Sequence, residues 1–166
     1  MRANVEMAGK IAKMHKDNIQ SGFLSSLGVV FLTMLYTFLI KHEIVIVKLD
    51  KGKVVGFAAI SLNSRKMMRR FILINFFKVI YFFLYNYRKL KLLSKITETI
   101  SVLFRPKSDT FSIENMPELL SIVVDERYRG AGVSSALIKE VEIMLHKKNI
   151  TKYSVIVGSN LIGAIK

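Results

Sequence analysis

The sequence predicts a single α/β domain, because helical and extended patterns alternate along a chain of one domain's length. Residues 43–50 and 54–62 are apolar segments with β-type alternation on either side of a turn at Gly52, which predicts a β-hairpin. Residues 117–147 read as an apolar strand, a glycine-containing turn and a helix with one apolar side. A chain of 166 residues can bury a sizeable core. We therefore expect residues 1–166 to form one domain.

Composition limits the partners and the chemistry. The chain is 51% hydrophobic with a mean hydropathy of +0.35, yet it carries a formal net charge of +14. Both properties favour an anionic, partly apolar partner such as a membrane surface, and an anionic coenzyme or nucleic acid also fits the charge. The absence of cysteine excludes disulfides, thiolate metal sites and a cysteine nucleophile. The first residues lack the apolar core of a signal peptide, so we expect a cytoplasmic location.

The N-terminal residues are expected to form a short strand and then a helix. Residues 2–5 fit a first strand, and residues 6–19 fit a helix with apolar side chains along one side. His15 belongs to this helix. A histidine without a second ligand nearby is more typical of packing or of the surface than of a metal site, and the same holds for His42 and His146. We therefore predict no metal.

Residues 18–40 contain no charged side chain. This run is long enough to suggest a transmembrane helix, since roughly 20 apolar residues suffice to span a bilayer. Small and polar residues interrupt it, namely Ser21, Gly22, Ser25, Ser26, Gly28 and Thr33. We therefore favour a turn followed by a shorter buried helix over residues 24–39.

Residues 63–115 are a basic and strongly apolar segment between the hairpin and the next predicted strand. From Arg65 to Lys107 there are eleven lysines and arginines and one acidic residue, Glu98. The apolar residues concentrate in residues 71–87, which we expect to form one helix about 25 Å long, shorter than the hydrocarbon core of a bilayer. A helix so apolar must be covered by something. A loop is expected further on, at residues 105–109.

Three kinds of partner for the apolar surface of this helix remain open. The first is protein, either the core of the same chain or the partner subunit of a homodimer. The second is the headgroup region of an anionic membrane, which the basic clusters within residues 65–107 suit. The third is nucleic acid, which is least favoured because the aromatic residues form one apolar block and no nucleic-acid-binding motif is present.

A phosphate site is predicted after the strand that ends at Val124. Arg129-x-x-Gly132-x-Ser134 follows this strand and leads directly into a helix. Glycines at such a turn let backbone N–H groups converge on an anion, and the helix N-terminus adds partial positive charge. The sequence lacks the Gly-Lys-Ser/Thr of a Walker loop and the spacing of the dinucleotide fingerprint. The loop is therefore of another kind.

The same segment resembles the coenzyme loop of the GNAT superfamily of acetyl-coenzyme A-dependent N-acyltransferases. That loop reads Gln/Arg-x-x-Gly-x-Gly/Ala after a strand that ends in Val. Here Val124, Arg129, Gly130, Gly132 and Ser134 fall in register with it. Ser134 departs from the family pattern, but it is also a small residue.

The elements around this loop resemble the family as well. Gly56 lies in a similar central hairpin, and a last strand over residues 152–157 leads to Asn160 and a helix of small residues. The resemblance implies an α/β fold with a mixed, twisted central sheet flanked by helices. It also implies a coenzyme-binding core over residues 118–164 and a helical insertion at residues 63–115, between the third and fourth strands.

The resemblance implies transfer of an acetyl group from acetyl-coenzyme A (acetyl-CoA) to a primary amine. Glu118 matches the position of the general base, with Glu114 in reserve and a solvent-facing role for Glu118 as the alternative. A base is needed because an ammonium is not a nucleophile. With a period of two residues, Glu118, Leu120, Ile122 and Val124 share one face. The residues implied in coenzyme binding are Ile122, Val123, Val124, Arg129, Gly130, Ala131, Gly132, Val133, Ser134, Ser135 and Asn160.

The acceptor amine is open at this point. A basic, apolar insertion suits an amine made at a membrane face, such as an amino sugar on a lipid or nucleotide carrier in surface-polysaccharide assembly. Acetylation of a peptide or protein amine is the alternative within enzymes. A typical family member continues past the last helix with a tyrosine that protonates the departing thiolate, so we expect a shortened C-terminal part. The other class is therefore a non-catalytic coenzyme-binding or membrane-binding module.

Overall fold

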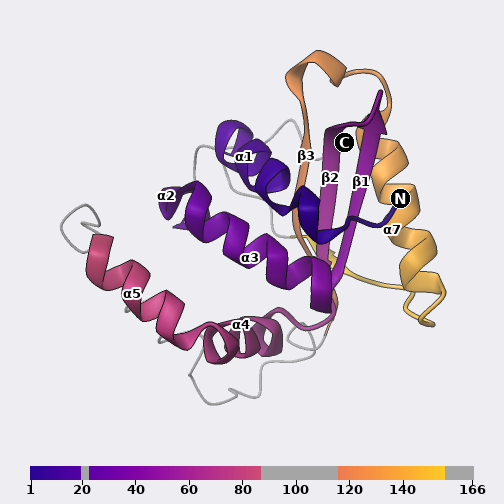
Figure 1. Ribbon diagram of the computed structural model, residues 1–166. Coiled ribbons are helices and arrows are strands. Elements are labelled where there is room, and N and C mark those ends of the chain that lie inside the picture. Colours follow the sequence, from indigo (N-terminus) through magenta and orange to yellow (C-terminus); the bar gives the residue numbers. More distant parts are fainter. Residues whose placement is uncertain (20–22, 87–115, 156–166) are drawn as a thin grey trace.

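A four-stranded mixed sheet forms the centre of the protein in the computed structural model, which describes residues 1–19, 23–86 and 116–155. The strand order is β1-β2-β3-β4, antiparallel between the first three strands and parallel between β3 and β4. Helices α1 and α3 cover one face and α7 covers the other (Figure 1). The α/β class and the mixed sheet are confirmed. The strands are Ile44–Asp50 (β1), Lys53–Ser61 (β2), Glu118–Val124 (β3) and Ser154–Val155 (β4).

The N-terminal residues run beside β1 without forming the expected strand over residues 2–5. Ala3 donates its N–H to the Val45 carbonyl at 2.8 Å, and Val47 donates to the Met1 carbonyl at 2.9 Å. The pairing is a single bridge, because the Asn4 side chain then accepts from the Met7 N–H and starts a short 3-10 helix, η1 (Val5–Met7). Helix α1 (Ala8–Asn18) follows directly, so the predicted helix is confirmed.

The uncharged run forms two helices that belong to the core. Helix α2 (Phe23–Ser26) and helix α3 (Gly28–His42) are separated at Leu27. Helix α3 buries most of one side, including Leu32, Leu35 and Tyr36, in the cluster that packs on the sheet. Within the described parts of the chain, no helix is long and apolar enough to cross a membrane. The buried-helix interpretation of this run is therefore correct.

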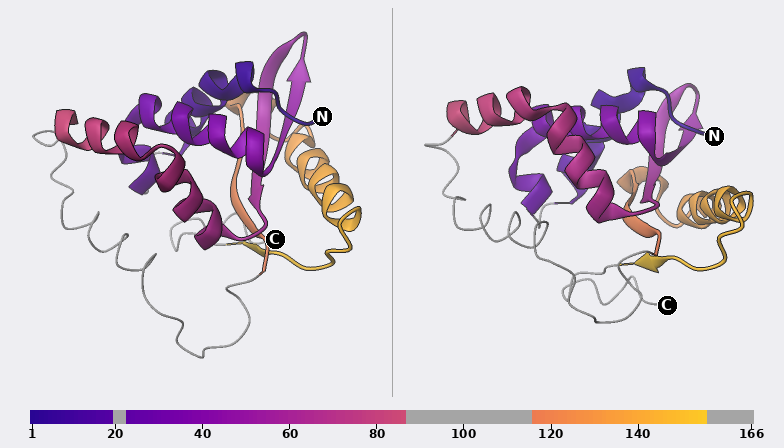
Figure 2. Two further views of the ribbon diagram at one scale, coloured as in Figure 1. Left: turned by 60° about the horizontal axis from the view of Figure 1, so that its bottom comes forward. Right: turned by 90° about the horizontal axis from the view of Figure 1, so that it is seen from below.

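The apolar insertion contains two helices where one was predicted over residues 71–87. Helix α4 (Ser64–Ile74) ends at Asn75, whose side-chain nitrogen donates to the Phe71 carbonyl at 3.0 Å, and α5 (Phe76–Asn86) starts afresh. The Asn75 backbone N–H donates to the same carbonyl at 3.0 Å, so the Phe71 carbonyl accepts two hydrogen bonds from Asn75. Phe71 packs edge-on against Phe31 and is fully buried. Helix α5 extends away from the sheet (Figure 2). The expected loop at residues 105–109 lies outside the described residues.

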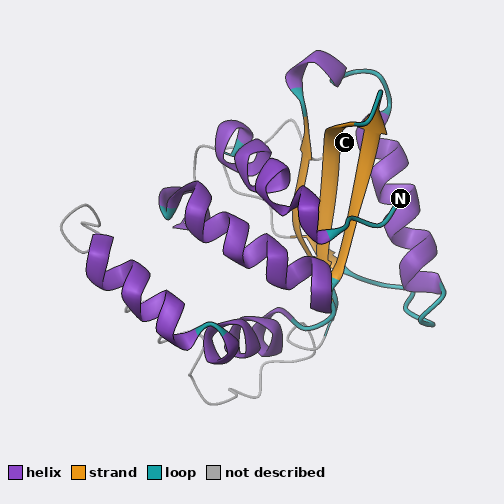
Figure 3. Ribbon diagram, viewed as in Figure 1, coloured by secondary structure: helices purple, strands orange, loops and turns teal. Residues whose placement is uncertain are grey.

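The segment after β3 follows the predicted pattern closely. Helix α7 (Val133–His146) buries one residue per turn against the sheet, namely Val133, Leu137, Val141 and Leu145. Figure 3 shows this helix on the opposite side of the sheet from α1 and α3. Of the last predicted strand, β4 is described at Ser154–Val155, and the helix expected after Asn160 lies outside the described residues.

Gly56 in β2 permits the close approach of α7, and we expect Gly56→Ala to destabilise the fold by about 1–3 kcal/mol. A Cβ at this position would lie 3.0 Å from Val133 Cγ1 and 3.1 Å from the Val123 carbonyl oxygen. Gly9→Ala is the matched control, because Gly9 lies in α1 with open space around it. That change should stabilise α1 by up to about 1 kcal/mol. Urea unfolding of both variants tests the contrast, and equal effects would contradict it.

Candidate active site

The turn between β3 and α7 is built on two glycines with left-handed backbone. Gly130 has φ of 80° and Gly132 has φ of 73°, a region that residues with a Cβ rarely adopt. A Cβ at either position would meet nothing within 4 Å, so the space beside both residues is open. Ala131 between them is exposed. The loop therefore presents main chain to the solvent and has room beside it for a ligand.

The first turn of α7 presents backbone N–H groups that have no hydrogen-bond partner among the described residues. The first helical hydrogen bond runs from the Ala136 N–H to the Gly132 carbonyl at 3.0 Å. Gly132 is the N-cap residue and no side chain caps the turn. The N–H groups of Val133, Ser134 and Ser135 thus lie at the positive end of a 14-residue helix. Such a terminus stabilises a phosphate group.

Ion pairs beside the turn fix its shape. The guanidinium of Arg127 donates to Asp125 at 2.9 Å, and this hydrogen bond lowers the pKa of the Asp125 carboxyl to about 2. Arg129 lies 3.5 Å from Glu126 in a second ion pair and donates to Asn18 Oδ1 at 3.0 Å, which connects the turn to the end of α1. The carboxylates are therefore paired with arginines next to the helix terminus.

Tyr128 anchors the turn to the β1–β2 hairpin. Tyr128 lies in the short 3-10 helix η3 (Glu126–Tyr128) that precedes the glycines. Its hydroxyl donates to Asp50 Oδ2 at 2.8 Å, and this hydrogen bond raises the pKa of the Tyr128 phenol. The loop is thus held by contacts to two distant segments, α1 and the hairpin, before any ligand is present.

Strand β3 contains a β-bulge that changes the predicted face pattern. Ala59 pairs with Ser121 whereas Ile60 pairs with Leu119, so Leu120 is an extra residue. Leu119 and Ile122 pack on the α7 side, whereas Leu120 packs on the α3 side. The expectation that Glu118, Leu120, Ile122 and Val124 share one face is therefore wrong. A period of two residues holds only where no residue is inserted.

Strand β4 pairs only with the beginning of β3 in the described residues. Glu118 pairs with Ser154 and Leu119 with Val155, and the Ser154 N–H donates to the Pro117 carbonyl at 2.7 Å. Beyond Leu119, no described strand lies on this side of β3. The main chain of Ile122, Val123 and Val124 continues from there toward the glycine turn. Asn160, the remaining predicted coenzyme residue, lies outside the described residues.

Glu118 lies at the first position of β3 and is half-buried. It is opposite Ser61 of β2. Because Leu119 packs toward α7, the alternation of strand side chains places Glu118 on the α3 side. The structure assigns it no hydrogen bond or ion pair with another described residue. The reserve residue Glu114 lies outside the described residues.

A buried polar chain lies on the same face and was missed by the sequence analysis. His15 Nδ1 lies 2.7 Å from Tyr36 Oη, which lies 2.9 Å from Ser121 Oγ. The three residues come from α1, α3 and β3 and all are buried. Burial lowers the pKa of His15 to about 4 and raises that of Tyr36. The available signal was spacing, since His15 follows Ile11 by four residues on the buried side of α1.

The two other histidines also have no ligand-like surroundings. The ring of His42 lies 4.5 Å from that of Phe38, and His146 is exposed. Across the described ranges, no group of three or more His, Asp or Glu side chains could hold a metal ion.

Comparison with solved structures finds the same fold in several acetyltransferases. A possible acetyltransferase from Clostridium difficile 630 superposes with a TM-score of 0.55 at 16% identity, covering 99% of this chain and 82% of that protein. An N-acetyltransferase from Staphylococcus aureus Mu50 gives 0.54 at 16%, covering 99% and 84%. An aminoglycoside 6'-N-acetyltransferase from Acinetobacter haemolyticus gives 0.54 at 11%, covering 98% and 81%. At these identities the likeness shows the fold.

The family assignment comes from the sequence. A search of curated proteins found no match. The family model described as acetyltransferase (GNAT) family matches residues 30–166, which include the sheet, the glycine turn and α7. This range covers well over half of the 166 residues. The GNAT family uses acetyl-CoA as its cosubstrate. The chain therefore belongs to the GNAT family and is a GNAT-type N-acetyltransferase.

Proposed function

We propose that this chain acetylates a primary amine with the glycine turn and β3 as its coenzyme site. One observation carries the proposal: two glycines with left-handed backbone conformation directly precede the first N–H groups of α7, and no side chain caps these groups. In this proposal the backbone of Arg129, Gly130, Ala131, Gly132, Val133, Ser134 and Ser135 holds the pyrophosphate. Main-chain groups of Ile122, Val123 and Val124 hold the pantetheine arm, and Asn160 flanks it.

The fit of these residues to the coenzyme has a physical basis. An anion at a helix N-terminus gains from both hydrogen bonds and the helix dipole. The open space beside Gly130 and Gly132 lets phosphate oxygens approach the main chain. After Leu119, no described strand pairs with the β4 side of β3, and the N–H and C=O groups along this edge form an extended line that suits amides of the pantetheine. Bound acetyl-CoA supplies the activated acyl group.

Glu118 acts as the general base in this proposal. A primary amine is an ammonium near neutral pH and has no free electron pair, so a proton must leave before the nitrogen attacks the thioester carbon. The Glu118 carboxylate accepts that proton directly or through one water. Its place on the α3 side of β3 puts the acceptor on that side of the sheet. The acceptor amine and helix α7 then lie on opposite faces of the sheet.

The surface next to α3 supports one class of acceptor. Helices α4 and α5 carry five basic residues, no acidic ones and many exposed apolar side chains. This surface suits an amine presented at the cytoplasmic face of a membrane, such as an amino sugar on a lipid or nucleotide carrier in surface-polysaccharide assembly. It would contact anionic membrane through residues 65–107. A peptide or protein amine is the second candidate acceptor. The alternative to membrane contact is a homodimer, in which the partner subunit covers the same face.

Replacing Glu118 with glutamine is expected to lower turnover by about 100-fold while leaving the Kd of acetyl-CoA unchanged. The amide keeps the shape of the side chain but cannot accept the proton, and a positioned base contributes 100-fold or more. The deficit should shrink as pH rises, because more of the acceptor amine is then unprotonated. Turnover is measured with a panel of amino sugars and peptide amines, and affinity by calorimetry.

The matched control is Glu142→Gln, because Glu142 is exposed on α7. This change should leave turnover intact. If Glu118→Gln also keeps full turnover, another group is the base. If the unaltered chain binds acetyl-CoA but acetylates no amine in the panel, the non-catalytic binding module becomes the better description.

A further inference from the structure

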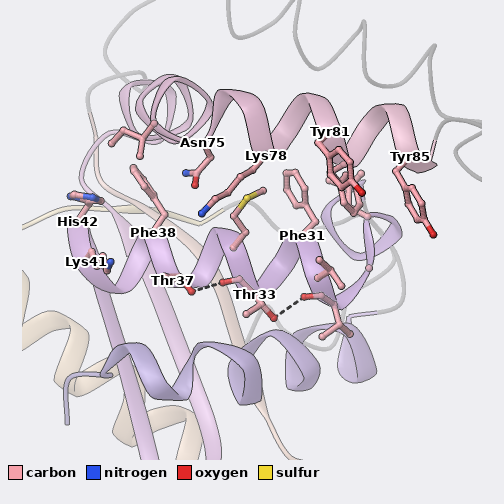
Figure 4. Close-up of a pocket in the computed structure, with 17 residues that line it drawn as sticks. Phe31, Thr33, Thr37, Phe38, Lys41, His42, Asn75, Lys78, Tyr81 and Tyr85 are labelled. Atoms are coloured by element: carbon pink, nitrogen blue, oxygen red, sulfur yellow. Dashed lines mark hydrogen bonds between the residues drawn. The ribbon is translucent and has the colours of Figure 1, made fainter.

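A large groove lies between α3 and the α4–α5 pair, away from the glycine turn. Its volume is about 1010 Å³. One wall is α3, which contributes Phe31 and Met34, and the other is α5, which contributes Tyr81 and Tyr85. Figure 4 shows Phe31 of α3 and Tyr81 of α5 on the two sides of the groove. A volume of this order suits a ligand of several hundred daltons rather than a few waters.

The floor of the groove is apolar although two threonines line it. Thr33 donates its hydroxyl to the Val29 carbonyl at 2.8 Å, and Thr37 donates to the Thr33 carbonyl at 2.7 Å. Both hydroxyls are therefore directed along the helix, and the threonine methyl groups remain for packing. Tyr81 and Tyr85 stack with ring centroids 6.1 Å apart and stay largely exposed, at 69% and 77%. The long axis of the groove thus suits an aliphatic chain.

One end of the groove is cationic. Lys41 and His42 come from the last turn of α3, and Lys78 and Asn75 come from the start of α5 and the break before it. In Figure 4, Lys78 points toward Asn75 and away from Tyr85. Of the described residues that line the groove, none is acidic. Within the described chain, no ion pair or hydrogen bond engages the ammonium of Lys41 or Lys78, and both side chains are exposed.

The charge around the groove selects among possible occupants. Helices α4 and α5 contain basic residues and no acidic ones, namely Arg65, Lys66, Arg69, Arg70 and Lys78. A second copy of the chain would bring two surfaces of like charge together, which opposes association. An anionic head with an apolar tail matches both ends of the groove. Beside it, Phe77 and Leu84 are 84% and 68% exposed, which suits insertion into a lipid surface.

We propose that the groove between α3 and α5 binds one anionic phospholipid of a membrane surface. The acyl chain lies between Phe31 and Tyr81, and the phosphate lies at the rim between Lys41 and Lys78. The exposed apolar residues of α5 rest among neighbouring lipids. This inference deepens the membrane contact in the proposed function. It is tested by lipid binding, so its failure leaves acetyl-CoA binding and acetyl transfer untouched.

The first test compares vesicle binding of charge variants of the full chain. Vesicles of phosphatidylcholine with phosphatidylglycerol should co-sediment the protein, whereas vesicles of phosphatidylcholine alone should not. Lys41→Gln with Lys78→Gln should weaken partitioning by about 30-fold, from about 1 kcal/mol for each lysine near the surface. The control is Lys10→Gln with Lys13→Gln, which removes the same charge from the exposed side of α1. It should change partitioning by less than about threefold.

The second test locates the lipid chain. The sequence contains no tryptophan, so Tyr85→Trp places a single indole in the groove wall, and Tyr153→Trp places one beside the α7 cluster on the other face. Brominated phosphatidylglycerol should quench the first indole and leave the second unchanged. Equal quenching at both sites, equal losses in the two lysine pairs, or no binding to anionic vesicles would each overturn the proposal. Inorganic phosphate that binds without lipid and is lost in the variant with both Lys41→Gln and Lys78→Gln would also overturn it, because the lysines would then hold a free anion rather than a lipid.

Discussion

Replacing Gly132 with valine is expected to raise the Kd of acetyl-CoA by about 1000-fold. A valine would have to adopt φ of 73°, which is unfavourable for a β-branched residue. Its side chain would also fill the open space where the pyrophosphate is proposed to lie. Losing two charge-assisted hydrogen bonds of about 1.5–3 kcal/mol each accounts for a change of this size. Calorimetric titration of acetyl-CoA into the purified chain measures it.

Gly28→Val separates lost binding from backbone strain. Gly28 has φ of 80° and is the first residue of helix α3, as Gly132 directly precedes helix α7. A Cβ built on Gly28 would also meet no atom within 4 Å. The two variants should therefore destabilise the fold to a similar extent in urea unfolding, but only Gly132→Val should lose the coenzyme. Micromolar binding by Gly132→Val would show that the pyrophosphate lies elsewhere. A parallel loss in both variants would point to destabilisation of the domain.

The parts of the fold that sequence reasoning predicted are those with strong local signals. Helix α7 has one buried residue at each turn from Val133 to Leu145, and the β1–β2 hairpin turns at a glycine with positive φ, Gly52. The glycine turn follows from the same kind of signal, since left-handed backbone after a strand requires glycine. In each case the residues that determine the conformation lie within about one turn of each other.

The parts that were wrong or missed depend on contacts between distant segments. The break at Asn75 occurs where Phe71, one turn earlier, packs against Phe31 and Phe38 of α3. The bulge at Leu120 depends on the register with β2. No periodicity within either segment distinguishes these outcomes from a straight helix or a regular strand. Their effect on the site is direct, because the bulge moves Glu118 and Ile122 to opposite faces.

The buried His15 should make the protein less stable as pH falls from about 6.5 to about 4. The pKa of His15 is lowered by burial to about 4 in the folded chain, from an ordinary value of 6.5. Between these values the unfolded chain binds a proton that the folded chain does not, so the free energy of unfolding increases with pH across this window. The contribution is complete above pH 6.5 and is lost progressively toward pH 4. We expect a loss of about 1–3 kcal/mol across it.

His15→Asn isolates this effect from the other titrations. An asparagine amide can still bond Tyr36, which lies 2.7 Å from His15 Nδ1, but it carries no titratable group. His146→Asn is the control, because His146 is exposed at the end of α7 and lies outside the buried chain. Urea unfolding from about pH 4.5 to 7.5 should give a flatter profile for His15→Asn than for the unaltered chain and His146→Asn. Asp125 titrates below this range, since Arg127 holds its pKa near about 2. Parallel profiles for all three proteins would mean that His15 has the same pKa in the folded and the unfolded chain, and the expected effect of its burial would then be wrong.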